Sequence, residues 1–377
     1  MTQLGPVALP GRDGAFALGL RDGIVVSVEP DAGPAQRIAL PAFSDLHVHA
    51  DRAFARGSRA PRSLADAIEL VREIKLASTV DDVRDRAIRL CEHALAHGTL
   101  NVRTHVDVDE LIGDRGLRGV LAARDALAGR VDLELVAFAT KFADPTTAEG
   151  LERLRWAVDN GADLLGGVPA FHRDPAASVE RILDLAVECD LPVDLHVDEA
   201  SAPDPFLLEA LADATLARRL EGRVTASHTC ALATVDSATA GRTIAKLAQA
   251  RITVIALPAL NLFLQDRGEE TPRARGLTLV RELIAAGVVV RFASDNVRDV
   301  FYPYGDADPL EAAWLAAISA HVDEEDDLLR GICGGRSRID VGDAADLVLV
   351  EASSVEEALS RRLAGRTVIR SGKVLAG

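Results

Sequence analysis

The sequence predicts an α/β protein in which a (β/α)8 TIM barrel is joined to a small β-sandwich domain formed by the two ends of the chain. Eight apolar runs of strand length follow one another after about residue 41, and amphipathic helical segments separate them. Both ends of the chain instead carry short strand-like runs separated by Gly and Asp turn residues. We therefore expect the small β domain at residues 1–40 and 336–377 and the barrel at residues 41–335.

The individual elements follow from the same patterns. The apolar runs end near His47, His105, Ala139, Gly166, His196, Ser227, Ala256 and Ala293. Helical spacing of apolar residues predicts helices over residues 81–97, 148–160, 176–188, 204–220, 242–250 and 277–286. Thr79 is the expected N-cap of the first of these helices, and Gly98 is its expected stop. Strands of the small domain are expected at residues 15–18, 23–28, 341–350 and 366–374.

Composition restricts the possible partners. The chain has 377 residues, of which 48% are hydrophobic and 27% charged, as in an ordinary soluble enzyme. Its net charge is −16 and it has no basic cluster, so nucleic acid is not an expected partner. No apolar stretch is long enough to span a bilayer, and the N-terminus lacks the order of a signal peptide. The four scattered cysteines form no Cys-x-x-Cys pair, so we expect reduced thiols and a cytoplasmic location.

Two histidines stand at the end of the first barrel strand. His47 and His49 are two residues apart, so in a strand both imidazoles point to the same face. Imidazole is the commonest metal ligand in proteins. Short His-x-His matches also arise by chance, so this motif alone leaves a metal site and a chance pairing about equally open.

Other predicted strand ends supply the partners that a metal site needs. His105, His196, His228 and Asp295 all lie there, and strand ends meet at one face of a (β/α)8 barrel. Any one of these residues could cap a helix or satisfy a turn. Several unpaired polar groups converging at one place would be costly without a metal or a substrate, so the set as a whole favours a functional site.

The set suits one divalent ion. The expected ligands are His47, His49, His196 and Asp295. Three neutral nitrogens and one carboxylate fit Zn²⁺ or Fe²⁺ and leave a position for water, whose pKa would fall toward about 7. Glu199, three residues after His196, could take the water proton and return it to a leaving nitrogen. His228 could orient the resulting hydroxide or stabilise developing charge.

These residues, in this order, resemble the amidohydrolase superfamily and, within it, the cytosine deaminase group. Besides His47-Val-His49, similar segments occur at residues 102–108, 161–169, 193–199, 224–229, 261–267, 275–278 and 294–305. The resemblance runs from about residue 38 to the C-terminus. It implies that the four residues named above bind the metal, that Glu199 is the proton shuttle, and that His228 positions the hydrolytic water.

The reaction implied by the resemblance is hydrolytic deamination of a small nitrogen heterocycle. A metal-bound hydroxide attacks an amidine-like ring carbon, Glu199 shuttles the proton, and ammonia leaves; Asp295 is counted as catalytic as well as a ligand. A bridging carboxylated lysine would belong at the fourth strand, where this chain has none, so one metal ion per chain is expected. The absence of a Pro-Cys-x-x-Cys motif separates the chain from the unrelated nucleoside deaminase fold.

The expected substrate pocket departs from the pattern of the cytosine deaminase group. The residues expected to contact substrate are His105, Thr140, Lys141, Asn296 and Phe301. Thr140 replaces a glutamine that reads the pyrimidine edge, Asn296 replaces an aspartate, and Phe301 replaces a tryptophan. A pocket that loses a bidentate amide should discriminate less well in favour of its old ligand, so we expect a heterocycle other than cytosine.

Several alternatives stay open on the sequence alone. The same machinery would serve a hydrolase that cleaves a cyclic amide or an N-substituted amine. A non-catalytic ligand-binding barrel is disfavoured because no ligand and no shuttle residue is missing. Lys141, with Arg52 and Arg298, could meet an anionic or carbonyl-rich substrate, or Lys141 could be an ordinary solvated lysine. A homo-oligomer is compatible with the sequence, and His93, His97, His172 and His321 receive no role.

Overall fold

Eight parallel strands form a nearly closed barrel in the computed structural model, which describes residues 2–57, 59, 64–202, 204–266 and 275–376. Neighbouring strands pair in chain order: β5 (Phe43–Val48), β6 (Thr99–Asp107), β7 (Asp132–Ala139), β8 (Leu164–Gly167), β9 (Val193–Val197), β10 (Val224–His228), β11 (Thr253–Ala256) and β12 (Val290–Phe292). A parallel bridge between Val48 and Asp295 joins the first strand to the segment after the last. The predicted barrel is confirmed, and each strand ends within two residues of its expected position.

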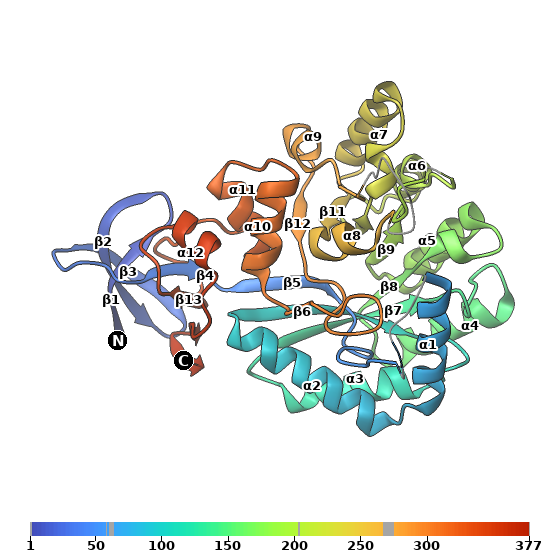
Figure 1. Ribbon diagram of the computed structural model, residues 1–377, viewed down its shortest axis with the longest axis horizontal. Helices are drawn as coiled ribbons and strands as arrows, with labels where there is room; N and C mark the ends of the chain where they lie inside the picture. The colour runs from blue at the N-terminus through green and yellow to red at the C-terminus, as the bar shows by residue number, and fades with distance from the viewer. Residues whose placement is uncertain (1, 58, 60–63, 203, 267–274, 377) are drawn as a thin grey trace.

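Helices connect the strands and surround the barrel (Figure 1). They are α1 (Leu64–Ala77), α2 (Val80–Ala96), α3 (Arg115–Ala126), α4 (Ala148–Asp159), α5 (Pro175–Cys189), α6 (Leu208–Arg218), α7 (Ser237–Gln249), α8 (Pro258–Leu264), α9 (Val280–Ala285), α10 (Pro309–Ser319), α11 (Glu325–Ile332) and α12 (Val355–Arg361), with 3-10 turns η1 (Pro169–Phe171) and η2 (Cys230–Ala233). The expected cap of α2 is confirmed, because Thr79 accepts from the backbone N–H of Asp82 and the Asp82 carboxylate accepts from that of Thr79.

Three helices begin three or more residues from the position that the sequence indicated, and one of these, expected from residue 277, begins at Val280. The helix expected over residues 204–220 begins only at Leu208, because the carboxylate of Asp198 accepts the backbone N–H groups of Leu207 and Leu208 and so fixes the start. The helix expected from residue 242 begins earlier, at Ser237. There Asp236 caps it by accepting from two backbone N–H groups.

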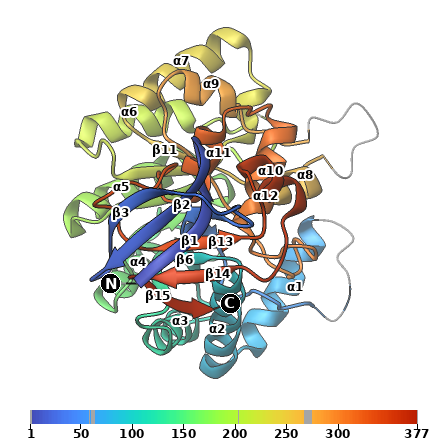
Figure 2. The same cartoon turned by 90° about the vertical axis from the view of Figure 1, so that its left-hand side faces the viewer.

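The two ends of the chain pair into one β domain beside the barrel, as predicted (Figures 1 and 2). Its strand order is β15 (Lys373–Ala376), β14 (Thr367–Arg370), β13 (Leu347–Val350), β4 (Ile38–Pro41), β1 (Thr2–Leu9), β2 (Arg12–Arg21) and β3 (Ile24–Asp31). All neighbours are antiparallel except β1 and β4, which meet at Ala8 and Ile38. The exact domain limits given above stay a prediction.

Strand β13 serves two hydrophobic cores. Leu347 and Leu349 pack with residues of β1 and β2 inside the β domain. The alternate residues Val348 and Val350 belong to the core of the barrel, because side chains alternate across a strand. Gly98, between α2 and β6, has φ +102° and a Cβ there would lie 2.5 Å from Val348, so this contact requires glycine. The β domain is therefore packed onto the barrel through shared strands.

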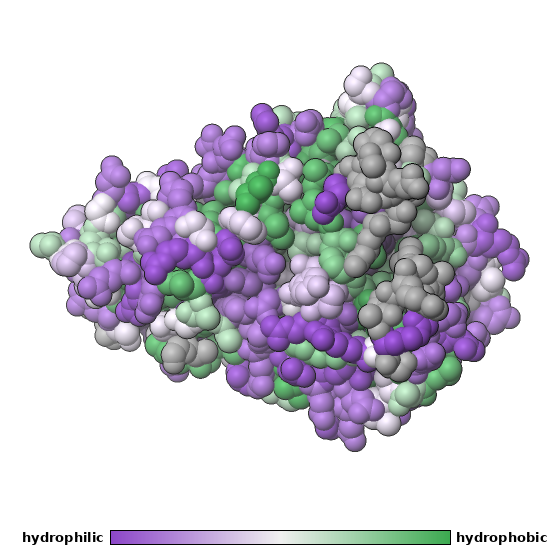
Figure 3. All heavy atoms as spheres, viewed as in Figure 1, coloured by the Kyte–Doolittle hydropathy of each residue, from purple (hydrophilic) through white to green (hydrophobic). Residues whose placement is uncertain are grey.

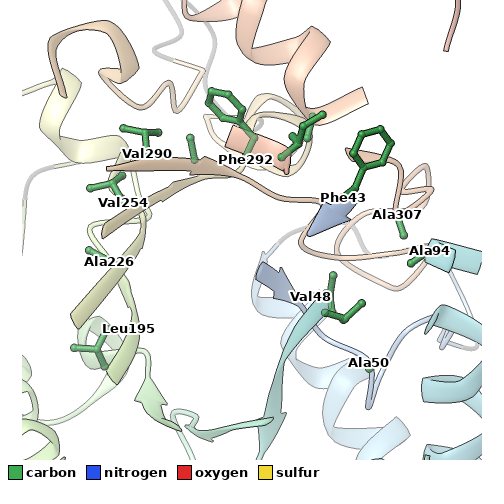
Figure 4. Packing of buried hydrophobic residues seen from close by; sticks show 14 of the residues in the cluster. Phe43, Val48, Ala50, Ala94, Leu195, Ala226, Val254, Val290, Phe292 and Ala307 are labelled. Atoms are coloured by element: carbon green, nitrogen blue, oxygen red, sulfur yellow. The ribbon is translucent and has the colours of Figure 1, made fainter. Parts of the chain in front are cut away.

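The same alternation directs polar residues into the barrel. In Figure 4, Leu195, Ala226, Val254 and Val290 point away from the barrel interior, toward the surrounding helices. Their neighbours in the strands, such as His196 after Leu195, consequently face inward.

The surface agrees with the composition. Hydrophilic residues predominate over the left and lower parts of the face shown in Figure 3. Within the described parts of the chain, no helix combines the length and the apolar character needed to cross a membrane.

Candidate active site

Five histidines from four strands gather at the carboxyl ends of the barrel strands. They are His47, His49, His105, His196 and His228, and each is at most 7% exposed. The ring of His47 lies 4.1 Å from that of His105 and 4.5 Å from that of His196, measured between centroids. The ring of His228 lies 4.8 Å from that of His196. The structure thus brings together the histidines that the sequence placed at strand ends.

Short contacts connect the side chains of the four expected ligands. His49 Nε2 lies 3.3 Å from Asp295 Oδ1 and 3.3 Å from His196 Nε2. His47 Nε2 lies 3.7 Å from the same oxygen of Asp295. Two ligands held about 2.1 Å from one tetrahedral ion lie roughly 3.4 Å apart, so these three contacts have the right length. The buried groups whose ligand atoms all lie within 4.8 Å of one another are His47 with His105 and His196, and His47 with His228 and Asp295.

The ionisation of these groups also fits a metal ion. Burial lowers the pKa of His47, His49 and His196 well below the ordinary value, which keeps the imidazoles neutral and their lone pairs available. Burial raises the pKa of Asp295 to about 7, and a bound cation would offset that cost. His47 Nε2 and both carboxylate oxygens of Asp295 have no hydrogen-bond partner among the described residues. A divalent ion would satisfy all three atoms.

A buried hydrogen-bond chain orients His47. The Ser227 hydroxyl donates to Asp194 Oδ1 at 3.0 Å, and the Ser227 oxygen lies 2.9 Å from His47 Nδ1. Because the hydroxyl proton is committed to Asp194, Nδ1–H of His47 is the donor, and the lone pair of Nε2 stays available for a metal ion. Arg103 donates to the second oxygen of Asp194 at 3.1 Å. Sequence reasoning missed Ser227 and Asp194 as site residues, although both belong to segments that carry the family resemblance.

Glu199 and His228 border the proposed ligands. Glu199 Oε2 lies 3.9 Å from His228 Nε2, and that nitrogen lies 3.8 Å from Asp295 Oδ2. Glu199 is 26% exposed at its side chain, so it borders the open side of the cluster. His228 and Asp295 have φ values of 72° and 62°, a left-handed conformation that residues other than glycine seldom adopt. Such backbone is retained where the surroundings dictate it, often at functional sites.

The five expected substrate contacts are placed unequally. His105 is fully buried against the histidine cluster, with Nε2 3.4 Å from Asp194 Oδ1. Lys141 is exposed, and its Nζ lies 4.7 Å from the ring centre of Phe142. Phe301 is half-buried, and its ring centre lies 5.5 Å from the guanidinium carbon of Arg52.

Thr140 and Asn296 are tied into the protein. The Thr140 hydroxyl donates to Asp109 Oδ2 at 2.6 Å and accepts from the backbone N–H of Phe142 at 3.2 Å. The side-chain amide of Asn296 donates to Asp299 Oδ2 at 2.5 Å. The Thr140 hydroxyl has therefore donated its only proton and can offer just an acceptor to a substrate, whereas the Asn296 amide keeps a second N–H and its oxygen.

A buried network of charged side chains surrounds Asp109, the partner of Thr140. Lys75 of α1, only 6% exposed, places Nζ 2.7 Å from Asp107 Oδ2 and 2.5 Å from Asp109 Oδ2. Arg52 donates to the other oxygen of Asp107 at 3.2 Å. Sequence reasoning gave Lys75 no role and did not predict α1. The rarity of lysine in this chain was the only available signal.

The remaining histidines lie outside the cluster. His172 is in a loop, as expected, but is buried, with Nε2 3.1 Å from the carbonyl oxygen of Thr140. His321 is exposed. Arg298, which the sequence left open as a contact for an anionic or carbonyl-rich substrate, pairs with Asp306.

Known proteins are similar to this chain over most of its length. The model of the family described as "Amidohydrolase family" matches residues 122–376. A pterin deaminase from Rhizobium rhizogenes is 37% identical over 357 residues, which cover 89% of this chain and 80% of that protein.

Solved structures agree over nearly the whole chain. The crystal structure of 5-methylcytosine deaminase from Klebsiella pneumoniae, liganded with 5-fluorocytosine, has a TM-score of 0.90 at 30% identity and covers 99% of this chain and 97% of its own. That of N-isopropylammelide isopropylaminohydrolase from Burkholderia multivorans has a TM-score of 0.85 at 29% identity and covers 100% and 98%. The family model spans more than half of the chain, and the deaminase from Rhizobium rhizogenes exceeds one third identity over most of it. This chain belongs to the amidohydrolase family.

Proposed function

We propose that this chain is a metal-dependent hydrolase that removes an exocyclic amino group, as ammonia, from a small nitrogen heterocycle. The observation that carries the proposal is the convergence of His47, His49, His196 and Asp295, with Glu199 beside them. Members of the family bind a metal, and two of the similar proteins described above are named as deaminases.

The four converging side chains would hold one divalent ion, Zn²⁺ or Fe²⁺. Such an ion, when bound, lowers the pKa of a water molecule toward about 7 and so supplies a nucleophile at neutral pH. The hydrogen bond from His47 Nδ1 to Ser227 keeps that imidazole in the tautomer that can serve as a ligand.

Glu199 moves the proton. Its carboxylate accepts a proton from water as the water oxygen bonds to the amino-bearing ring carbon. It then gives this proton to the exocyclic nitrogen, so the carbon–nitrogen bond breaks with neutral ammonia as the leaving group. The ring retains the water oxygen as a carbonyl or hydroxyl group, which balances the reaction.

His228 positions the attacking water. Its Nδ1 lies 3.0 Å from Asn261 Oδ1, an acceptor, so Nδ1 carries a proton and the ring orientation is fixed. Nε2 then faces the space between Asp295 and Glu199. A group at this point can hold the water in line with both the proton acceptor and the ring carbon.

The substrate is proposed to be an aminated heterocycle other than cytosine, and a pterin is the first to test. Thr140 lies two residues beyond Phe138, whose ring is 4.5 Å from that of His196, so it lies near the mouth of the barrel. With its only donor committed, Thr140 favours a ring that presents an N–H group to it. The similarity to a pterin deaminase supports this choice.

A second activity has its own support. The similarity to N-isopropylammelide isopropylaminohydrolase covers the whole of this chain. The same residues would then protonate a substituted amine instead of ammonia as the leaving group. The two activities would use the same residues and differ only in which carbon–nitrogen bond of the substrate the water attacks.

The test is a panel of pterin, cytosine, 5-methylcytosine and N-isopropylammelide, incubated with metal-loaded protein. We expect ammonia release from pterin at a higher kcat/KM than from cytosine. Isopropylamine release without any ammonia release would select the second activity. Absence of carbon–nitrogen cleavage across aminated pterins, pyrimidines and triazines would contradict both.

A further inference from the structure

A second group of metal-ligating side chains lies away from the catalytic end of the barrel. His93 belongs to the last turn of α2, and His97 caps the end of that helix. The chain passes from there through Gly98 into the start of β6, so these histidines lie toward the amino ends of the strands. Asp306 reaches the same place from the segment between β12 and α10.

The geometry of this group is that of a helical metal motif. His93 and His97 are four residues apart, and histidines at this spacing lie on one face of a helix. Their ring centroids are 4.9 Å apart. His93 Nε2 lies 2.9 Å from Asp306 Oδ1 and His97 Nε2 lies 3.3 Å from Asp306 Oδ2. The three ligand atoms all lie within 4.8 Å of one another, close to the roughly 3.4 Å expected around one tetrahedral ion.

One of the three candidate ligand atoms, His97 Nε2, has no hydrogen-bond partner among the described residues. This nitrogen is buried, and the carboxylate of Asp306 is nearby. A buried ring nitrogen without a partner is costly, and a cation between it and the carboxylate would satisfy it.

The charges around the group are mixed. Burial lowers the pKa of His97, which favours the neutral, ligating form. The hydrogen bond and charge of His93, with the charges of His97 and Arg298, hold the pKa of Asp306 below its ordinary value despite partial burial. Arg298 contacts Oδ1 of Asp306, so Oδ2 is the oxygen that faces His97. Asp308, 3.9 Å from His97 Nδ1, is paired with Arg366.

We propose that His93, His97 and Asp306 form a second divalent-cation site of the kind that takes Zn²⁺. Two imidazoles and one carboxylate are ligands that zinc accepts, with water completing the tetrahedron. The three side chains are 31%, 13% and 35% exposed, so a cation can reach them from solvent.

The site would act on the segment that forms one side of the active site. Residues 293–308 connect β12 to α10 and include Asp295 near their start. A cation bound to Asp306 and to α2 pins the far end of this segment to the barrel wall. Zinc at this site therefore stabilises the folded chain without taking part in the reaction.

Zinc stoichiometry tests the proposal without reading activity. Metal-free protein is titrated with Zn²⁺ in the micromolar range, and bound zinc and Tm are measured for wild type, His97→Gln and His93→Gln. His321→Gln is the matched control, since it removes an exposed histidine elsewhere. We expect about two zinc ions per chain in the wild type and the control, and about one in each test variant.

The outcomes separate this site from the catalytic one. Loss of one zinc, with a smaller zinc-induced rise in Tm, in either test variant supports the proposal. If His97→Gln fails to fold, His93→Gln, at the more exposed of the two histidines, decides. Equal zinc content in the wild type and both test variants overturns it. A failure of the proposed deaminase activity would leave this count unchanged.

Discussion

The backbone N–H of Asp295 donates a 2.8 Å hydrogen bond to the carbonyl oxygen of His47. This contact joins β5 to the segment after β12, beside the bridge of Val48 to Asp295. The same two residues supply proposed ligands, with His47 Nε2 and Asp295 Oδ1 3.7 Å apart. The contacts that close the barrel therefore also bring two of the proposed metal ligands together.

Metal bound at the strand ends should stabilise the closed barrel. A ligand that binds only the folded chain stabilises it by about 4 kcal/mol at roughly 1,000 times its Kd. We expect Zn²⁺ to raise the Tm of chelator-treated protein by several degrees, measured by calorimetry. The His97→Gln background removes any contribution from the second site. If Zn²⁺ leaves the Tm of His97→Gln unchanged, metal at the strand ends does not stabilise the closed barrel, and the prediction is wrong.

Ser227→Ala should weaken metal binding without removing a ligand. The substitution takes away the acceptor of His47 Nδ1–H, so the ring loses its fixed tautomer and orientation. Losses of about 10- to 100-fold in metal affinity are typical for such outer partners. Competition with a chromophoric chelator measures the affinity. Ser360→Ala on α12 is the control and should leave it unchanged.

Lys75→Met should destabilise the fold and disturb Thr140. Removing the ammonium leaves the buried carboxylates of Asp107 and Asp109 without their main partner, and such losses cost about 3–5 kcal/mol. Urea unfolding measures the change. Lys246→Met removes a lysine from a surface pair with Glu209 and should have a much smaller effect. Equal losses in the free energy of unfolding for the two substitutions would show that the buried pairs of Lys75 stabilise the fold no more than a surface pair does.

The strand ends could be read from sequence because both the apolar runs and the polar residues that follow them are local features. His47, His49, His196, Glu199, His228 and Asp295 stand at such positions, and the structure brings them together. Their alternation with outward apolar neighbours, such as Leu195, is visible in the sequence as well.

The long-range contacts could not be read in this way. Lys75 reaches Asp109 across 34 residues of sequence, and nothing near either residue indicates the other. The hydroxyl of Thr140 looked available for substrate until its hydrogen bond to Asp109 was seen. His93 and His97 carried no signal without Asp306, which is 213 residues from His93. The sequence predicted that strands from the two ends of the chain form one β domain, but it did not predict which residues pair between these strands.

Stability should depend on pH through Glu325. Burial, followed by hydrogen bonding and charge from Glu356, raises the pKa of Glu325 from 4.5 to about 7. The folded chain therefore holds a proton that the unfolded chain releases, so this contribution is complete below about pH 4 and is lost as the pH rises through about 7. Glu325→Gln should reduce the fall in urea midpoint between about pH 5 and pH 8. Glu351→Gln, at an exposed position, should not, and equal slopes in all three proteins would contradict the assignment.

The central claim is that Glu199 transfers the proton in a metal-dependent deamination. The most direct measurement is ammonia release by wild type and Glu199→Gln from the same substrate, with metal content determined on the same samples. We predict that Glu199→Gln keeps the wild-type metal content and loses at least about two orders of magnitude in kcat. Wild-type turnover by Glu199→Gln, or full ammonia release by metal-free wild type, would contradict the account.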